Sequence, residues 1–144
     1  MIDRIDIRPN DCILLLSIPE ISLVVQLADR ARNGSVVGLG RDEEVHSART
    51  GTRDLGNVMF TPASPEQIPW RDSFFTKALD LVCRWEQPER AARELFRVLA
   101  PGGKAYLADA SSIRALLPAA GFSEVSSEGA FLVVERPGLP SPVS

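Results

Sequence analysis

The chain has 144 residues, of which 44% are hydrophobic and 24% are charged, and this is the composition of one ordinary globular domain. A domain of this length buries enough apolar surface to fold without disulfides or metals, so a stapled mini-protein and a disordered chain are excluded. The formal net charge of -3 lacks the basic excess that phosphate backbones attract, and we expect no nucleic-acid partner.

The cysteines and the apolar runs indicate the compartment. Cys12 and Cys83 lie in apolar runs without a second cysteine or histidine at metal-ligand spacing, which predicts buried thiols in a reducing environment and no metal site. No basic leader precedes an apolar segment, and no apolar run approaches the ~20 residues that cross a membrane. We therefore expect a cytoplasmic protein that is not inserted in a membrane.

Short apolar runs alternate with amphipathic stretches from the first residues onward. Residues 13–16 are apolar on every face, as in a central parallel strand. Pro19 suits the first position of a helix that ends before Gly34. Further strands are expected at 35–39 and 58–61. A helix is expected over 42–51, because acidic residues suit its first turn.

The middle of the chain repeats this alternation. An apolar run predicts a strand over 78–83. Pro88 begins a predicted helix with an apolar inner face, and Pro101-Gly102-Gly103 predicts a turn into a strand over 104–108. Each strand is thus followed by a helix long enough to return the chain to the same edge of a sheet.

The last elements are a short helix and a hairpin. Ser111 or Ser112 caps the helix, Pro118 kinks or shortens it, and Gly121 ends it. The runs 122–126 and 130–135 are expected to pair as an antiparallel hairpin. Residues 1–136 are expected to form a single domain, followed by a frayed proline-rich tail over 137–144.

Repeated strand and helix units that end in a hairpin predict an α/β fold. The expected architecture is a three-layer sandwich around a doubly wound, mostly parallel sheet of Rossmann-like type, with an antiparallel hairpin at its end. Ligands of such sheets bind at the carboxyl ends of the strands. The candidate positions are therefore 17–20, 40–42, 62–65 and 83–86.

Several short motifs resemble one family. The helix from Pro88 runs into Arg97-Val98-Leu99-Ala100-Pro101-Gly102-Gly103, and supporting matches are Arg8-Pro9-Asn10-Asp11, Val36-Val37-Gly38-Leu39, Ile68-Pro69-Trp70 and Ala120-Gly121-Phe122. With them, the chain from about Ile7 to Pro137 resembles class I S-adenosylmethionine-dependent methyltransferases. The resemblance implies the methyltransferase fold. Because these motifs include turns and helix faces, they are also consistent with a purely architectural role.

The resemblance also indicates four candidate cofactor-binding residues, which are Ser17, Gly40, Asp42 and Ser64. The glycine-rich loop of the family aligns with residues 17–21, where every glycine is replaced. The acid that accepts the ribose hydroxyls aligns with Gly40, so Asp42 either substitutes for it or only stabilises its helix. The acid near the adenine aligns with Ser64, which either contacts the cofactor or turns the backbone.

These replacements favour a pseudo-methyltransferase that binds a partner or ligand, with no cofactor and no catalytic residue. The alternative is an active methyltransferase that uses S-adenosylmethionine in a divergent site. The first hypothesis predicts that Ser17, Ile18 and Pro19 narrow the space for the methionine part of the cofactor. The loosely alternating residues 1–8, which include Ile2, Ile5 and Ile7, are expected to pack on the sheet edge of this chain or of a second copy in a homodimer.

Overall fold

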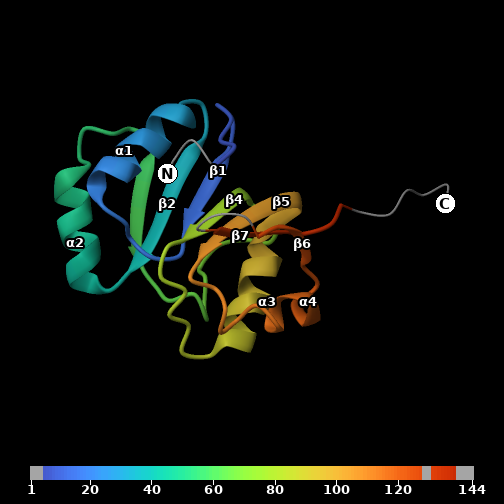
Figure 1. The fold of residues 1–144 in the computed structure, drawn as a ribbon. Coiled ribbons are helices and arrows are strands. Elements are labelled where there is room, and N and C mark those ends of the chain that lie inside the picture. Colours follow the sequence, from blue (N-terminus) through green and yellow to red (C-terminus); the bar gives the residue numbers. More distant parts are fainter. Residues whose placement is uncertain (1–4, 128–130, 139–144) are drawn as a thin grey trace.

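The computed structural model describes residues 5–127 and 131–138, and in these ranges seven strands form one sheet in the order β3-β2-β1-β4-β5-β7-β6 (Figure 1). The strands are β1 (Cys12–Leu15), β2 (Ser35–Gly40), β3 (Val58–Pro62), β4 (Phe75–Asp80), β5 (Leu99–Ala108), β6 (Ser123–Ser126) and β7 (Phe131–Glu135). The helices are α1 (Ile21–Arg30), α2 (Asp42–Gly51), α3 (Pro88–Val98) and α4 (Leu116–Ala120).

The predicted doubly wound sheet is confirmed. Strands β1 to β5 pair in parallel with their neighbours, whereas β7 runs antiparallel to both β5 and β6. The chain order reverses between β1 and β4, so the loops after these two strands diverge at the carboxyl edge of the sheet. A crevice for a ligand forms at such a reversal.

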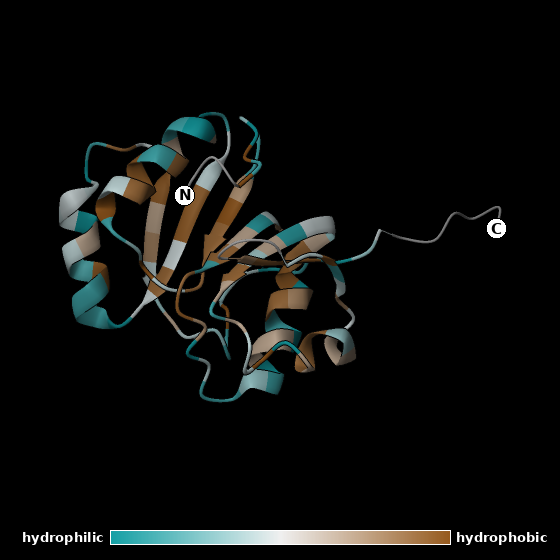
Figure 2. Ribbon diagram, in the orientation of Figure 1, coloured by the Kyte–Doolittle hydropathy of each residue, from teal (hydrophilic) through white to brown (hydrophobic). Residues whose placement is uncertain are grey.

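Helices cover both faces of the sheet, as the ribbon shows (Figure 1). Ile13 and Leu15 of β1 pack with Val24 of α1, whereas Leu14 of the same strand packs with Leu95 of α3. The central strands β1 and β2 are accordingly mostly hydrophobic, and the helices carry hydrophilic residues toward solvent (Figure 2). A strand that is buried on both faces cannot alternate polar and apolar residues, which is why residues 13–16 read as one apolar run.

Several element boundaries differ from prediction. Helix α1 begins at Ile21, not at Pro19, because the carbonyl of Glu20 accepts the first helical amides, from Leu23 and Val24. Strand β4 lies at Phe75–Asp80 and ends three residues before the predicted 78–83, since the chain leaves the sheet after Asp80.

The segment expected to turn at residues 101–103 lies inside β5. The register between β4 and β5 shifts there, which marks a bulge, and Gly102 adopts a φ of 85°. Helix α4 begins at Leu116 after Ala115, so neither Ser111 nor Ser112 caps it. It contains Pro118 and spans 5 residues, which agrees with the expected shortening.

Two of the family motifs are bonded to each other. The Arg97 guanidinium of α3 donates to the carbonyls of Ile68 and Trp70, each at 2.8 Å. The same group pairs with the carboxylates of Glu94 and Asp72, also at 2.8 Å. The motif around residue 97 therefore holds the loop before β4 against α3, which is an architectural role.

The Arg8-Pro9-Asn10-Asp11 motif is also architectural. The Asp11 carboxylate accepts the amide of Arg8 at 2.7 Å, the hydroxyl of Thr76 at 2.8 Å and the ammonium of Lys77 at 3.1 Å. These bonds join the segment before β1 to β4 at the amino edge of the sheet, opposite the candidate ligand positions.

The terminal segments lie partly outside the described residues. Ile5 is buried in the core on the α1 side of its own chain, and the amide of Asp6 donates to the Tyr106 hydroxyl at 3.4 Å. Ile2 and residues 139–144 of the expected tail are outside the described ranges. Within the described ranges, no helix has the length and apolar character needed to span a membrane.

Candidate functional site

A cavity of about 750 Å³ opens at the carboxyl edge of the sheet. Three of the four predicted positions, Ser17, Gly40 and Ser64, line this cavity, and they come from the loop after β1, the last residue of β2 and the loop after β3. The loop after β4 and the start of α3 complete the wall with Arg84, Glu86 and Arg90. The predicted strand ends therefore meet, as the parallel sheet requires.

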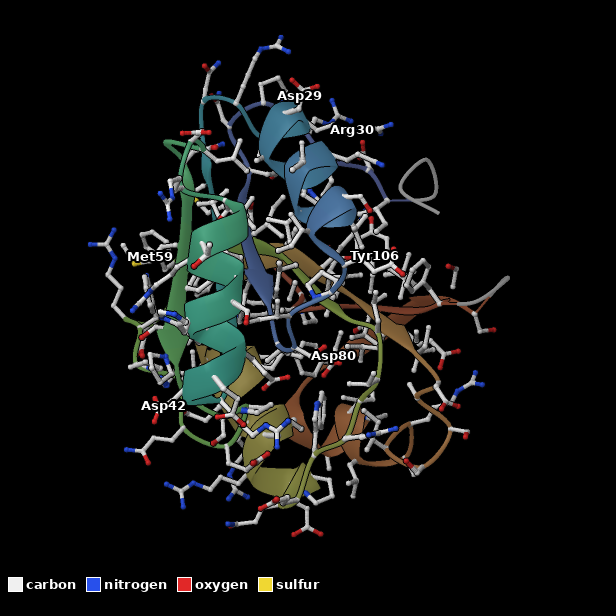
Figure 3. The ribbon with its side chains drawn as sticks, turned by 90° about the vertical axis from the view of Figure 1, so that its left-hand side faces the viewer. Asp29, Arg30, Asp42, Met59, Asp80 and Tyr106 are labelled. Atoms are coloured by element: carbon white, nitrogen blue, oxygen red, sulfur yellow. The ribbon has the colours of Figure 1, made fainter. Side chains whose placement is uncertain are left out.

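Asp42 does not line the cavity. It is exposed in the first turn of α2, at the outer end of that helix in Figure 3. Glu44, two residues later, lines the cavity instead. Its exposed carboxylate accepts the Arg41 amide at 2.9 Å and the Arg41 guanidinium at 3.2 Å, and these bonds hold its pKa below the ordinary value. Glu44 is thus an ionised group on the cavity wall.

Ile18 lies over Gly40. A Cβ built on Gly40 would approach Cδ1 of Ile18 to 2.8 Å and the Cβ of Glu44 to 3.4 Å. The first distance is shorter than real Cβ contacts, so an acidic side chain at residue 40 requires Ile18 to move. Residue 40, where the family has an acid, is a glycine in this chain, and the side chain of Ile18 occupies the space that an acid would need.

Asp80 fixes the loop that follows β4. Its side chain is central between the layers in Figure 3 and is 2% exposed. Oδ1 accepts the amides of Val82 at 3.0 Å and Cys83 at 2.9 Å, and Oδ2 accepts the Trp85 indole at 2.8 Å. The Ser17 hydroxyl also donates to Oδ1, at 3.2 Å. Asp80 therefore joins the loops after β1 and β4.

Cys83 and Trp85 are core residues of this loop. Both are buried on the α3 side of the sheet, and Cys83 has a φ of 48°. Burial raises the pKa of the Cys83 thiol far above its ordinary value, and the charges of Asp80 and Asp109 raise it further. The thiol stays protonated at neutral pH and is a poor nucleophile. Neither residue lines the cavity.

Ser64 begins a turn beside a buried acid. The amide of Gln67 donates to the Ser64 carbonyl at 3.1 Å, so Ser64 has the turn-forming role that the sequence suggested. Glu66 lies within this turn and lines the cavity. Burial raises its pKa, the neighbouring charge of Glu86 raises it further, and Arg90 lowers it. The sequence analysis did not single out Glu66 or Asp80, although Asp80 is an acid at the end of β4.

The cavity remains open beside the residues that replace the glycine loop. Ser17, Ile18 and Pro19 form part of its wall, and Ile18 narrows it only toward Gly40. The described residues contain no cluster of His, Cys, Asp and Glu that could hold a metal ion. The site thus combines a large concave volume, two serine residues and both signs of charge.

Comparisons with known proteins identify the family of this chain and support its fold. A family model described as "Methyltransferase domain" matches residues 22–107, which is more than half of the chain. The chain belongs to this methyltransferase-domain family. The match extends from α1 to β5 and includes Gly40, Asp42 and Ser64, but not Ser17.

A curated relative is the ubiquinone/menaquinone biosynthesis C-methyltransferase UbiE from Vibrio cholerae, which is 32% identical over 74 residues. The match covers 50% of this chain and 26% of the relative, so the chain spans only a minor part of that protein. The resemblance to methyltransferases that the sequence motifs indicated is confirmed. Catalytic activity does not follow from this partial match.

Solved structures support the fold. A SAM-dependent methyltransferase from Aquifex aeolicus superposes with a TM-score of 0.81 at 15% identity, over 93% of this chain and 85% of the other. The YcgJ protein from Bacillus subtilis superposes with a TM-score of 0.75 at 17% identity, over 87% of this chain and 67% of the other.

S-adenosylmethionine fits the cavity in volume, because ligand pockets measure ~300–1,000 Å³. The polar groups on the cavity wall match those of the cofactor only in part. Glu44 supplies an ionised carboxylate within one helical turn of Gly40, and Ser17 and Ser64 supply hydroxyls. The conformational freedom of a glycine loop is absent from residues 17–21.

Proposed function

We propose that this chain binds S-adenosylmethionine in the carboxyl-edge cavity and acts as a methyltransferase with a divergent cofactor site. The observation that carries the proposal is that Ser17, Gly40 and Ser64, from the carboxyl ends of three different strands and the loops that follow them, converge on one open cavity of about 750 Å³. A cavity at these positions is the place where an open α/β sheet binds its ligand. Membership of the methyltransferase-domain family supports the same proposal.

Three residues of this chain would hold the cofactor. Glu44 would accept the ribose hydroxyls in place of Asp42, since its carboxylate is ionised and lines the cavity. The hydroxyl oxygens of Ser17 and Ser64 would bind other polar groups of the cofactor. S-adenosylmethionine supplies an electrophilic methyl group when bound. The chain's own contribution is to orient that molecule and to exclude water from it.

A non-catalytic binding protein is the second candidate, and one contact favours it. Ile18 uses the space that a side chain at residue 40 would need, and Pro19 cannot donate a backbone hydrogen bond to a cofactor. On this hypothesis the cavity binds a different ligand or the chain binds a partner, and S-adenosylmethionine is not used.

Thermal unfolding in the presence of S-adenosylmethionine tests the proposal at Glu44. A ligand at 100 times its Kd stabilises the folded state by about 2.7 kcal/mol, which is measurable as an increase in Tm. We expect Glu44→Gln to reduce the ligand-dependent increase and Glu43→Gln to retain it, because Glu43 is exposed and does not line the cavity. An equal increase in both variants would refute the role of Glu44, and no increase in the wild type would favour the second candidate.

A further inference from the structure

One wall of the cavity carries a buried carboxyl group with an unpaired oxygen. Glu66 lines the cavity and is 9% exposed. Its Oε2 atom is buried and has no hydrogen-bond partner among the residues that the structure describes. An unsatisfied buried polar atom is destabilising, and such atoms are rare in folded proteins unless they have a functional role.

Glu66 lies among charges of both signs. Burial raises its pKa most, the charge of Glu86 raises it further, and Arg90 and backbone hydrogen bonds from Glu66 and Gln87 lower it. Glu66, Glu86 and Arg90 line the cavity together, and their electrostatic influence on one another indicates one corner of it, while Arg84 adds a further guanidinium to the wall. Despite these neighbours, one oxygen of the Glu66 carboxyl has no donor among the described residues.

We propose that this corner, formed by Glu66, Glu86 and Arg90, binds a singly charged ammonium or amidinium group of a small organic ligand, with Glu66 as the direct acceptor. A cation that carries N–H groups supplies the missing donor as a charge-assisted hydrogen bond to the carboxylate, whereas an alcohol supplies only a neutral donor. The terminal torsion of a glutamate is soft, so Oε2 turns toward the cavity without backbone movement.

The ligand class is therefore an amine or amidine small enough to enter a cavity of about 750 Å³. The site does not require S-adenosylmethionine, because Glu66 is a different group from the serines and Glu44 that the methyl-donor proposal uses. Within an active methyltransferase, the same corner would recognise an amine-bearing methyl acceptor.

Two-dimensional NMR of the full chain tests this site with cyclohexylammonium at pH 7 and with cyclohexanol as the uncharged control of similar shape. We expect the amine to shift the backbone amide signals of Glu66, Gln67 and Gln87 in a saturable manner, and the alcohol to have at least tenfold lower affinity. Glu66→Gln should abolish the saturable shifts. Glu89→Gln should retain them, because Glu89 is an exposed acid near α3 that does not line the cavity.

A second pair of variants tests the charge balance without altering the acceptor. Arg90→Ala should strengthen amine binding several-fold because it removes the competing positive charge, whereas Arg93→Ala, at an exposed position outside the cavity lining, should leave binding unchanged. Shifts that persist in Glu66→Gln, equal affinity for the alcohol, or weaker binding in Arg90→Ala would overturn the proposal.

Calorimetry with S-adenosylhomocysteine on the same samples separates this inference from the proposed function. Amine binding without S-adenosylhomocysteine binding would refute the methyl-donor proposal and support the Glu66 site. S-adenosylhomocysteine binding without saturable amine binding would refute the Glu66 site alone.

Discussion

Ile18 and Gly40 share one space at the carboxyl edge of the sheet, because a Cβ on Gly40 would lie 2.8 Å from Cδ1 of Ile18. The loop after β1 and the end of β2 are therefore matched to each other. An acid at residue 40 requires the end of the Ile18 side chain to move.

Gly40→Asp alone should destabilise the protein by about 0.5–1.5 kcal/mol, the cost of forcing the Ile18 side chain away from its preferred rotamer. Adding Ile18→Ala should recover part of this loss, because the clashing atoms are removed. Urea unfolding of both single variants and the double variant measures the coupling between the two positions. Strictly additive effects would show that the two side chains do not compete.

The same double variant should bind S-adenosylmethionine more tightly than the wild type. Ile18→Ala opens the wall, and Gly40→Asp places a carboxylate where the family has its ribose acceptor. Titration calorimetry compares the double variant with Ile18→Ala alone, which has the space but lacks the acid. An affinity no higher than that of Ile18→Ala would contradict the expectation.

Asp11→Asn should lower the free energy of unfolding by about 3 kcal/mol, the cost of breaking a buried ion pair. Burial alone would raise the pKa of Asp11, but the Arg8 amide, the Thr76 hydroxyl and Lys77 together lower it. This stability is present above the ordinary pKa of 3.8 and is lost as the pH falls through the lower folded value. Acid unfolding checks this, with Asp6→Asn at an exposed position as control.

Arg97→Lys should destabilise the protein by about 2 kcal/mol although it conserves the charge. A lysine cannot reproduce the guanidinium fork that contacts Ile68, Trp70 and the two carboxylates. Arg93→Lys, on the exposed face of the same helix, should change stability by less than about 0.5 kcal/mol. Equal effects of the two variants in chemical denaturation would refute the role of Arg97 in holding the loop before β4 against α3.

Glu66→Gln should raise the free energy of unfolding by about 1 kcal/mol at pH 7, because it removes a buried charge. The folded pKa of Glu66 is above the ordinary 4.5, so the wild type loses stability as the pH rises through the folded value. The advantage of the variant should therefore shrink as the pH falls toward 4.5. Unfolding curves from pH 4.5 to 8 measure it, and a variant less stable throughout would contradict the account.

The order of strands and helices could be predicted because buried strands leave long apolar runs. Hydropathy could not locate the end of β4, since Leu81, Val82 and Cys83 continue the apolar run beyond Asp80. The strand ends there because Asp80 accepts the amides of Val82 and Cys83, and this bonding depends on a side-chain conformation. The bulge at Gly102 could not be predicted either, because Pro101-Gly102-Gly103 is a sequence typical of a turn.

The candidate site could be predicted as a set of strand ends, and Ser17, Gly40 and Ser64 meet there. Asp42 and Glu44 could not be distinguished from spacing alone, since two residues in a helix differ by about 200° in direction and either could face the cavity. No pattern in the sequence around Glu66 indicates that this residue is buried, because its burial results from the packing of the loop after β3 against the start of α3.

The central claim is that the carboxyl-edge cavity binds the methyl donor, and titration calorimetry of the wild-type chain with S-adenosylhomocysteine tests it most directly. We predict binding of one ligand per chain with a Kd on the order of 10 μM, which corresponds to about -7 kcal/mol. Loss of this binding in Glu44→Gln but not in Glu43→Gln would assign it to the cavity. No measurable binding at millimolar ligand to a folded wild-type chain would contradict the claim.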